Sequence, residues 1–306
     1  MNKDLISGFD LERKDINAIF DLTGRLKKKK DNTMLKGKVV GLVFQKPSMR
    51  TRVSFEIGAR QLGAHCMYLA PQDIHLGKRE PVKDVARVLS RYLDAIVART
   101  FSHEHIIELA SYGDMSVING LSDLYHPCQA LADIYTLYER TGTFKGLKFT
   151  FVGDGNNVVN SLAAIAAKVG LDFTVATPKG YEPDKDIWRQ ALKIARETKA
   201  RLVHTYDVNN AVKAADVIYT DVWTSMGQEK EHKKRLKAFK KFQVTMDMFK
   251  HASKGCYFMH CMPVHRGEEV TDEVVESKHS IIFDQAENRL HVQKAVMALL
   301  LQGKSK

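Results

Sequence analysis

The sequence predicts an α/β protein made of two doubly wound parallel-sheet domains that are linked by long helices. Short apolar runs alternate with longer amphipathic runs, which is the pattern of β-α-β units. The alternation stops at a long helical segment near residue 140 and then starts again. The chain has 306 residues, of which 44% are hydrophobic, and this is enough for two domains with cores of their own.

Four apolar runs in the first half predict buried strands, over residues 38–44, 67–70, 94–99 and 115–120. Apolar side chains at helical spacing fill the segments between them, which are 52–64, 81–92 and 103–113. We expect Pro81 in the first turn of its helix, where a missing N–H costs nothing. A long helix over 126–142 closes this half, so the sequence predicts a first domain over residues 1–140.

The second half repeats the alternation and predicts a second domain over residues 141–285. We expect its strands over residues 146–154, 171–177, 201–206, 215–223, 257–260 and 280–284. One helix is predicted to end at Gly170 and another to run through 185–198. The tail, residues 286–306, reads as a closing helix that packs back on the first domain.

The net charge is +11, a balance that fits nucleic acid, a membrane surface or small anionic substrates as partners. Basic runs at 25–30 and 230–241 carry much of it, and we interpret both as solvated helix faces. The chain lacks the aromatic-interleaved basic pattern of a nucleic-acid domain and an apolar run of membrane-spanning length. We therefore expect neither nucleic acid nor a membrane as partner.

The four cysteines include no C-x-x-C pair, which in a chain of this size favours reduced thiols. The first ten residues lack the apolar core of a signal peptide. Both observations predict a cytoplasmic protein.

The stretch FQKPSMRTRVSFE, residues 44–56, follows a predicted strand and opens a predicted helix. A helix start offers unpaired N–H groups and a positive dipole end, so it is a ready site for an anion. Ser48 and Thr51 add hydroxyl donors, and Arg50 or Arg52 adds a guanidinium fork. Only one of the two arginines is expected to face the anion, and an N-cap serine beside solvated arginines is the alternative.

Three further side chains lie where a ligand of such a sheet is expected. Arg99 ends the third strand, and ligands of open α/β sheets bind at the carboxyl ends of strands. His126 and Gln129 open the long helix and share one of its faces. An ion pair for Arg99 and a structural histidine remain the alternatives.

The segment FVGDGNN, residues 151–157, is similar to a dinucleotide fingerprint but departs from it. Val158 stands at the third glycine position, and the next strand ends in Thr-Pro where an acidic residue would hold a ribose. We therefore expect no nicotinamide cofactor, although Asn156 and Asn157 could still meet a ligand.

Asp221 ends another strand, and its carboxylate could meet a cationic ligand, with Ser225 and Gly227 in a flexible loop after it. His260, Cys261 and His265 match no common zinc spacing. We expect no metal and no other cofactor.

Six motifs in order, SMRTR, HPCQALAD, FVGDGNNVVNSL, DVWTSMGQE, HCMPVHRGEEV and AENRLHVQKA, span the chain. Together they resemble the ornithine carbamoyltransferases. The resemblance implies a cofactor-free homotrimer with sites at subunit interfaces that makes L-citrulline and phosphate from carbamoyl phosphate and L-ornithine, in arginine biosynthesis.

The resemblance also implies roles for individual residues. Those expected to be catalytic are Arg50, Thr51, Arg99, His126 and Cys261. Those expected to bind carbamoyl phosphate are Ser48, Met49 (through its backbone), Arg50, Thr51, His75, Arg99, His126, Gln129, Cys261, Met262 and Arg289. Those expected to bind ornithine are Asn157, Asp221, Ser225 and Met226.

Three positions depart from the family pattern. Met49 stands where the family usually has Thr, and Met262 where it has Leu, a swap of similar volume. His75 stands where a Gln often reaches a neighbouring subunit's site, and a histidine there would make its contribution depend on pH. A carbamoyltransferase for another amine such as putrescine, and a basic binding protein on the same fold, remain the alternative functions.

Overall fold

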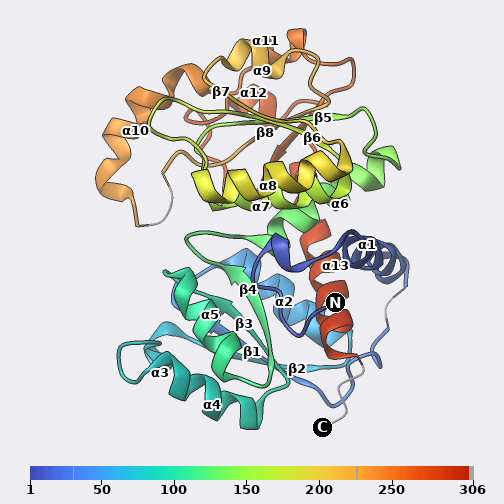
Figure 1. The fold of residues 1–306 in the computed structure, drawn as a ribbon, viewed down its shortest axis with the longest axis vertical. Coiled ribbons are helices and arrows are strands. Elements are labelled where there is room, and N and C mark those ends of the chain that lie inside the picture. The colour runs from blue at the N-terminus through green and yellow to red at the C-terminus, as the bar shows by residue number, and fades with distance from the viewer. Residues whose placement is uncertain (30, 225–226, 303–306) are drawn as a thin grey trace. The chain divides into compact units, whose positions relative to one another are not determined.

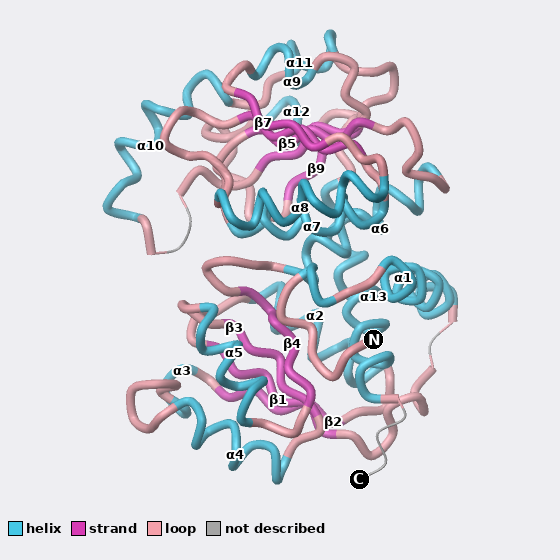
Figure 2. Tube along the Cα trace, viewed as in Figure 1, coloured by secondary structure: helices cyan, strands magenta, loops and turns pink. Residues whose placement is uncertain are grey.

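The computed structural model describes residues 1–29, 31–224 and 227–302, and it divides the chain into two compact units. The first unit comprises Met1–Tyr135 and Asn288–Lys306, and the second comprises Thr136–Glu287. Each contains one parallel sheet with helices on both faces (Figures 1 and 2). The predicted fold class is confirmed.

The first unit contains a four-stranded sheet in the order β2-β1-β3-β4. Its strands are β1 (Val39–Phe44), β2 (His65–Leu69), β3 (Ala95–Arg99) and β4 (Ser116–Leu121). Its helices are η1 (Gly8–Asp10), α1 (Arg13–Lys28), α2 (Met49–Gln61), α3 (Pro71–Ile74), α4 (Val82–Tyr92) and α5 (His103–Tyr112). Two long helices, α6 (Pro127–Thr141) and α13 (Ile282–Leu301), belong partly to each unit.

The second unit contains a five-stranded sheet in the order β7-β6-β5-β8-β9. Its strands are β5 (Lys148–Val152), β6 (Asp172–Ala176), β7 (Leu202–Thr205), β8 (Val217–Thr220) and β9 (Tyr257–His260). Its helices are α7 (Asn157–Val169), α8 (Lys185–Thr198), α9 (Val208–Val212), η2 (Glu229–Glu231), α10 (His232–Phe239), η3 (Lys240–Phe242), α11 (Met246–His251) and α12 (Asp272–Val275).

Successive side chains along a strand point to opposite faces of the sheet, and in both sheets the side chains on both faces are largely apolar and buried. In the first unit, Val43 and Ile96 pack with Val85 of α4 and Ile106 of α5. In the second, strand residues such as Ile218 pack with α9, α11 and α12, while α7 and α8 lie on the other face (Figure 1). Parallel strands that are buried on both faces read as continuous apolar runs, which is why the sequence reveals them.

Two local predictions are wrong. Residues 280–284 form no strand: Ser280 makes a single bridge with Phe258, and α13 starts at Ile282. The Gln285 N–H already donates to the Ile281 carbonyl at 2.9 Å, so two apolar residues are too few to extend the sheet before helical bonding starts. Pro81 is the N-cap of α4, one position before the first turn in which it was expected.

Both sheets have a topological switch point, where the chain reverses the direction in which it adds strands. In the first unit, β2 and β3 lie on opposite sides of β1. In the second, β6 and β8 lie on opposite sides of β5. Ligands of open α/β sheets bind outside the carboxyl ends of the strands at this point.

Candidate active site

The loop after β1 leads into α2 at the switch point of the first sheet. Ser48 is the N-cap of α2, and its Oγ accepts a hydrogen bond from the Thr51 N–H at 3.4 Å. The same hydroxyl donates to Thr51 Oγ1 at 3.1 Å. Thr51 is buried, so the helix start presents a fixed hydroxyl among its N-terminal N–H groups.

The two arginines of this loop have different surroundings. Arg52 is exposed, its Nε donates to Glu56 at 3.3 Å, and its guanidinium lies over the Tyr68 ring at 3.8 Å. Arg50 is half-buried, and its charge acts on Arg99. Of the two, Arg50 is therefore the one that the structure groups with the other predicted anion ligands.

Arg99, at the end of β3, lies among other cations. It is buried, and its pKa falls to about 10 because of burial first and then the charges of Arg289 and Arg50. Within the part of the chain that the structure describes, its Nε has no hydrogen-bond partner. Burying like charges together costs free energy unless an anion binds to them, so this group fits an anionic ligand.

Arg289 connects α13 with the start of α2. Its Nη2 donates to Thr51 Oγ1 at 2.9 Å, and its side chain is buried. A residue close to the end of the sequence is thereby joined to the motif near residue 50.

His126 and Gln129 lie at the start of α6, where the His126 carbonyl accepts from the Gln129 N–H at 3.1 Å. His126 is buried, and its pKa lies well below 6.5 because of burial and then the charges of Arg289 and Arg99. The imidazole is therefore neutral at pH 7. The Gln129 amide nitrogen donates to Asp133 at 2.7 Å, whereas its buried oxygen has no partner among the described residues, so Gln129 offers an acceptor to a ligand.

His75 and Met49 are the exposed members of the predicted set. His75 is the C-cap of α3 in a left-handed conformation (φ 42°), and its carbonyl accepts from the N–H groups of Lys78 and Arg79. Met49 is the first residue of α2, and the residue is 71% exposed, so only its backbone N–H belongs to the group of donors at the helix start.

In the second unit, the Asp221 carboxylate follows β8 at the switch point. Its Oδ1 accepts from the Val222 N–H at 2.8 Å and from Cys261 Sγ at 2.9 Å. Its Oδ2 accepts from Asn156 Nδ2 at 2.7 Å. The loops after β5, β8 and β9 therefore converge on one buried carboxylate.

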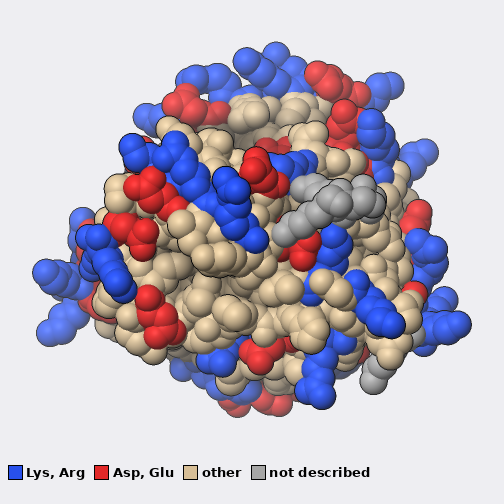
Figure 3. Space-filling view, turned by 90° about the horizontal axis from the view of Figure 1, so that it is seen from below, with Lys and Arg blue, Asp and Glu red and all other residues tan. Residues whose placement is uncertain are grey.

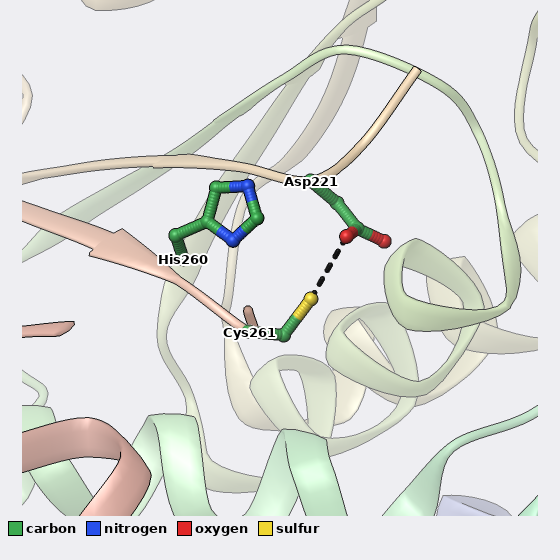
Figure 4. A group of neighbouring side chains, drawn as sticks. All are labelled: Asp221, His260 and Cys261. Carbon is green, nitrogen blue, oxygen red and sulfur yellow. Dashed lines mark hydrogen bonds between the residues drawn. The ribbon is translucent and has the colours of Figure 1, made fainter. Parts of the chain in front are cut away.

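Figure 4 shows Asp221, His260 and Cys261, whose ligand atoms lie within 4.8 Å of one another. Both His260 nitrogens already have partners, because Nε2 pairs with Glu269 at 3.0 Å and Nδ1 accepts from the Met262 N–H at 2.8 Å. The Cys261 thiol donates to Asp221 (Figure 4). A metal would have to displace these bonds, so the residues do not fit one, and the sequence interpretation against zinc stays a prediction.

Met262 follows in the same loop, with φ at 57°. A side-chain-bearing residue adopts this left-handed conformation at a free-energy cost, and such positions are frequent at functional sites.

The turn after β5 uses its two asparagines differently. Asn156 is the N-cap of α7 and accepts from the N–H groups of Val158 and Val159. Asn157 is the first residue of α7, at the helix end to which a carboxylate is attracted. A Cβ on Gly155 would lie 2.4 Å from the backbone of Glu182 and of Pro183, so this position requires glycine. The other two predicted ornithine ligands, Ser225 and Met226, lie outside the described residues.

The comparisons with known proteins agree with this geometry. Residues 3–139 match the family described as "Aspartate/ornithine carbamoyltransferase, carbamoyl-P binding domain", and residues 145–300 match its "Asp/Orn binding domain". The chain belongs to the aspartate/ornithine carbamoyltransferase family.

Relatives in this carbamoyltransferase family cover nearly the whole chain. It is 55% identical to the ornithine carbamoyltransferase of Pyrococcus horikoshii over 90% of this chain and 86% of that protein. It is 50% identical to that of Halalkalibacterium halodurans over 98% of this chain and 96% of that protein. The solved ornithine carbamoyltransferase of Pyrococcus furiosus superimposes with a TM-score of 0.96, at 50% identity, over 99% of this chain and 98% of that chain.

Sequence reasoning missed several buried charged groups, among them Arg235. Arg235 is buried although it lies in the basic run that we interpreted as a solvated face, and it pairs with buried Asp154 at 2.7 Å. The available signal was Phe239, four residues further on, which marks the inward face of the same helix.

Proposed function

We propose that the protein transfers the carbamoyl group of carbamoyl phosphate to the δ-amine of L-ornithine, giving L-citrulline and phosphate. The observation that carries the proposal is the buried Arg99, whose neighbouring charges are the cations Arg289 and Arg50. Membership of the family and the Asp221 carboxylate support the second substrate.

Carbamoyl phosphate is bound by the first unit in this proposal. Its phosphate accepts from the start of α2, namely Ser48, the Met49 backbone, Arg50 and Thr51, with Arg289 beside them. Gln129 accepts from the carbamoyl NH₂ through its oxygen, since its amide nitrogen is bonded to Asp133.

The carbamoyl carbonyl oxygen becomes negative as the amine attacks, and Thr51, Arg99 and His126 stabilise it. A preorganised donor of this kind contributes roughly 3 kcal/mol to the barrier. His126 acts as a hydrogen-bond donor and not as an acid, because its lowered pKa leaves the imidazole neutral.

The bond changes are those of acyl transfer. The δ-nitrogen forms a bond to the carbamoyl carbon, the bond from that carbon to the phosphate oxygen breaks, and the leaving phosphate takes the proton of the amine. The amine must be neutral to attack, and a water-poor site lowers its pKa from about 10. Arg50 and Ser48 stabilise the departing phosphate.

Ornithine is bound by the second unit. The α-ammonium meets the Asp221 carboxylate, and the α-carboxylate meets Asn157 at the start of α7. Cys261 and Met262 line the place of the ornithine side chain and the carbamoyl group. The Cys261 thiol donates to Asp221 and so orients that carboxylate.

The assembly is a homotrimer in this proposal. Met49, Val53 and Ile57 form an exposed apolar stripe on α2, and exposed Met67 lies on the neighbouring edge strand β2. Such a stripe fits a subunit interface, and the exposed His75 fits a role in a neighbouring subunit's site.

Sedimentation measurements test the trimer. A charge in the stripe, Val53→Glu, is expected to dissociate it, whereas Val88→Glu, at a similarly exposed valine of α4, is expected to leave it intact. Equal sedimentation of both variants with the wild type would refute the α2 interface.

We also propose a cytoplasmic location and the biosynthetic direction. The four cysteines form no disulfide in the described part of the chain, and none of the helices described is long and apolar enough to cross a membrane. The relative from Pyrococcus furiosus is named anabolic. Basic and acidic side chains are interspersed on the face in Figure 3, which gives no support to a nucleic-acid-binding function.

The decisive experiment measures carbamoylated product from carbamoyl phosphate with ornithine, putrescine, lysine and aspartate in parallel. Product with ornithine and not with putrescine is expected, because Asp221 and Asn157 recognise an α-amino acid; aspartate lacks a side-chain amine, and the amine of lysine lies one methylene further from the α-carbon than that of ornithine. Product mainly from putrescine would be consistent with the proposed carbamoyl-phosphate site but would refute the residues assigned to the ornithine site. No product from any amine would refute the proposed reaction.

A further inference from the structure

Helix α10 faces the sheet of the second unit with one of its cations. Lys233, Lys234 and Lys237 are exposed, whereas Arg235 is only 6% exposed. A buried guanidinium costs free energy unless acceptors surround it, so its partners decide what it does.

Arg235 bonds to the loops after two different strands. Its Nη1 donates to Asp154 Oδ2 at 2.7 Å in the loop after β5, and to the Trp223 carbonyl at 3.0 Å in the loop after β8. Its Nε donates to Glu231 at 3.1 Å, just before α10. These two loops lie on either side of the switch point; the second contains Asp221, and the first leads directly into α7, which begins at Asn157.

Aromatic rings extend this link to a third loop. The guanidinium lies 5.0 Å from the centre of the Tyr181 ring, in the loop after β6. Tyr181 and Trp223 both pack on Phe239 of α10, with ring centres 4.6 and 5.7 Å apart. The Tyr181 carbonyl in turn accepts from the Gly155 N–H at 2.9 Å. Helix α10 therefore holds the carboxyl ends of β5, β6 and β8 together (Figure 1).

Arg235 is also the positive charge among several carboxylates. Burial raises the pKa of Asp154, and the charges of Asp221 and Glu231 raise it further, whereas Arg235 lowers it. Without Arg235, the carboxylates of Asp154, Asp221 and Glu231 would repel one another across the two loops.

We propose that Arg235 is a positioning residue for the amino-acid end of the amine substrate. By holding the loops after β5 and β8 in one arrangement, it sets Asp221 and Asn157 at the separation that an α-ammonium and an α-carboxylate require. The inference rests on the proposed function, and it assigns Arg235 no contact with the substrate.

The test compares Arg235→Gln with Lys234→Gln, which removes the same charge from an exposed position of the same helix. We expect Arg235→Gln to raise KM for ornithine about tenfold to hundredfold, the usual cost of a lost charge-assisted hydrogen bond. KM for carbamoyl phosphate should stay within about twofold, because that substrate is assigned to the first unit. Lys234→Gln should resemble the wild type.

Two further variants separate positioning from stability. Arg235→Lys restores a charge without the planar guanidinium whose Nη1 bonds to both loops while its Nε bonds to Glu231, so thermal stability should largely recover while KM for ornithine stays raised. The double variant D154N/R235Q removes the buried carboxylate that would lack a countercharge, so it too should regain stability with KM still raised.

L-Norvaline has the amino-acid end of ornithine but no δ-amine, so it cannot react. Its affinity, measured by calorimetry, therefore reports on the same site without turnover. Arg235→Gln is expected to weaken it as much as it raises KM. If the wild-type protein makes citrulline and Arg235→Gln binds norvaline and ornithine as tightly as the wild type does, the inference about Arg235 is wrong and the proposed function stands. A wild-type protein that neither makes citrulline nor binds norvaline would overturn the proposed function together with the inference.

Discussion

The two units have the same topological feature and opposite local chemistry. At the switch point of the first sheet, Arg99 is buried beside Arg289 and Arg50, and its pKa falls to about 10, first because of burial and then because of these two charges. At that of the second sheet, the buried carboxylate of Asp154 has Arg235 as its countercharge. The sheet thus fixes where a ligand binds, and the sign of the surrounding side chains decides which ligand it is.

The difference also concerns when the charges are balanced. In the first unit we expect an anionic ligand to offset the repulsion around Arg99, so that binding free energy and charge neutralisation are coupled. In the second, Arg235 pairs with Asp154 before any ligand arrives, and Asp221 is fixed by three hydrogen bonds. Changes to the first group should therefore affect the reaction itself, and changes to the second should affect selection of the amine.

The largest effect is expected from Arg99→Ala. Removing a donor from the developing oxyanion should lower kcat by about a hundredfold to a thousandfold. Steady-state kinetics and phosphate binding measure this, with the exposed Arg91→Ala as control. Weaker binding with unchanged turnover of bound substrate would show that Arg99 only holds the anion.

A smaller and more selective effect is expected from Asp221→Asn. The neutral amide loses the attraction for the α-ammonium, so KM for ornithine should rise about tenfold to hundredfold. Binding of carbamoyl phosphate should not change. Exposed Asp247→Asn serves as control. Weaker carbamoyl-phosphate binding in Asp221→Asn would contradict the division of labour between the units.

The third effect is on stability and depends on pH. The pKa of His126 lies well below 6.5, so the unfolded chain takes up a proton at that position while the folded protein does not. The stability due to the neutral imidazole is complete above pH 6.5 and is lost as the pH falls towards the folded pKa, by about 1.4 kcal/mol per unit of pKa difference.

Urea unfolding at pH 7.5 and pH 5.5 of wild type, His126→Gln and the exposed His251→Gln measures this contribution. The wild type and His251→Gln should lose more stability on acidification than His126→Gln does. An equal loss in all three proteins would argue against a neutral, buried His126.

The smallest effect is expected from His75→Gln. Its side chain is exposed at the end of α3, so kcat/KM at pH 7.5 should change by less than about threefold, well under 1 kcal/mol. A loss comparable to that of Arg99→Ala would place His75 among the main ligands of the anion.

Much of this fold can be predicted from the sequence, because buried parallel strands appear as continuous apolar runs and amphipathic helices as apolar residues at helical spacing. The predicted helix 185–198 and strand 257–260 have the bounds that the structure gives. The wrong strand at 280–284 contains only two consecutive isoleucines, and a short apolar run fits a helix start as well as a strand.

The candidate site is readable to a lesser degree, because side-chain pairing depends on three-dimensional neighbours. The residue pattern alone could not choose between Arg50 and Arg52; the family resemblance named Arg50, and in the structure Glu56 and Tyr68 engage Arg52. The resemblance also assigned Arg289 and Thr51 to one site, but no local pattern indicates that these residues, 238 positions apart, are hydrogen-bonded. Residues that are adjacent only after folding carry no local signal.

The tight turn at Gly155 has a consequence for inheritance. A single nucleotide change in a glycine codon is either silent or introduces a stop or a residue with a Cβ, and any Cβ here would lie 2.4 Å from the chain at Glu182. No missense allele at this codon is conservative, not even alanine. We expect the position to remain glycine through generations of descent unless the 182–183 segment changes with it.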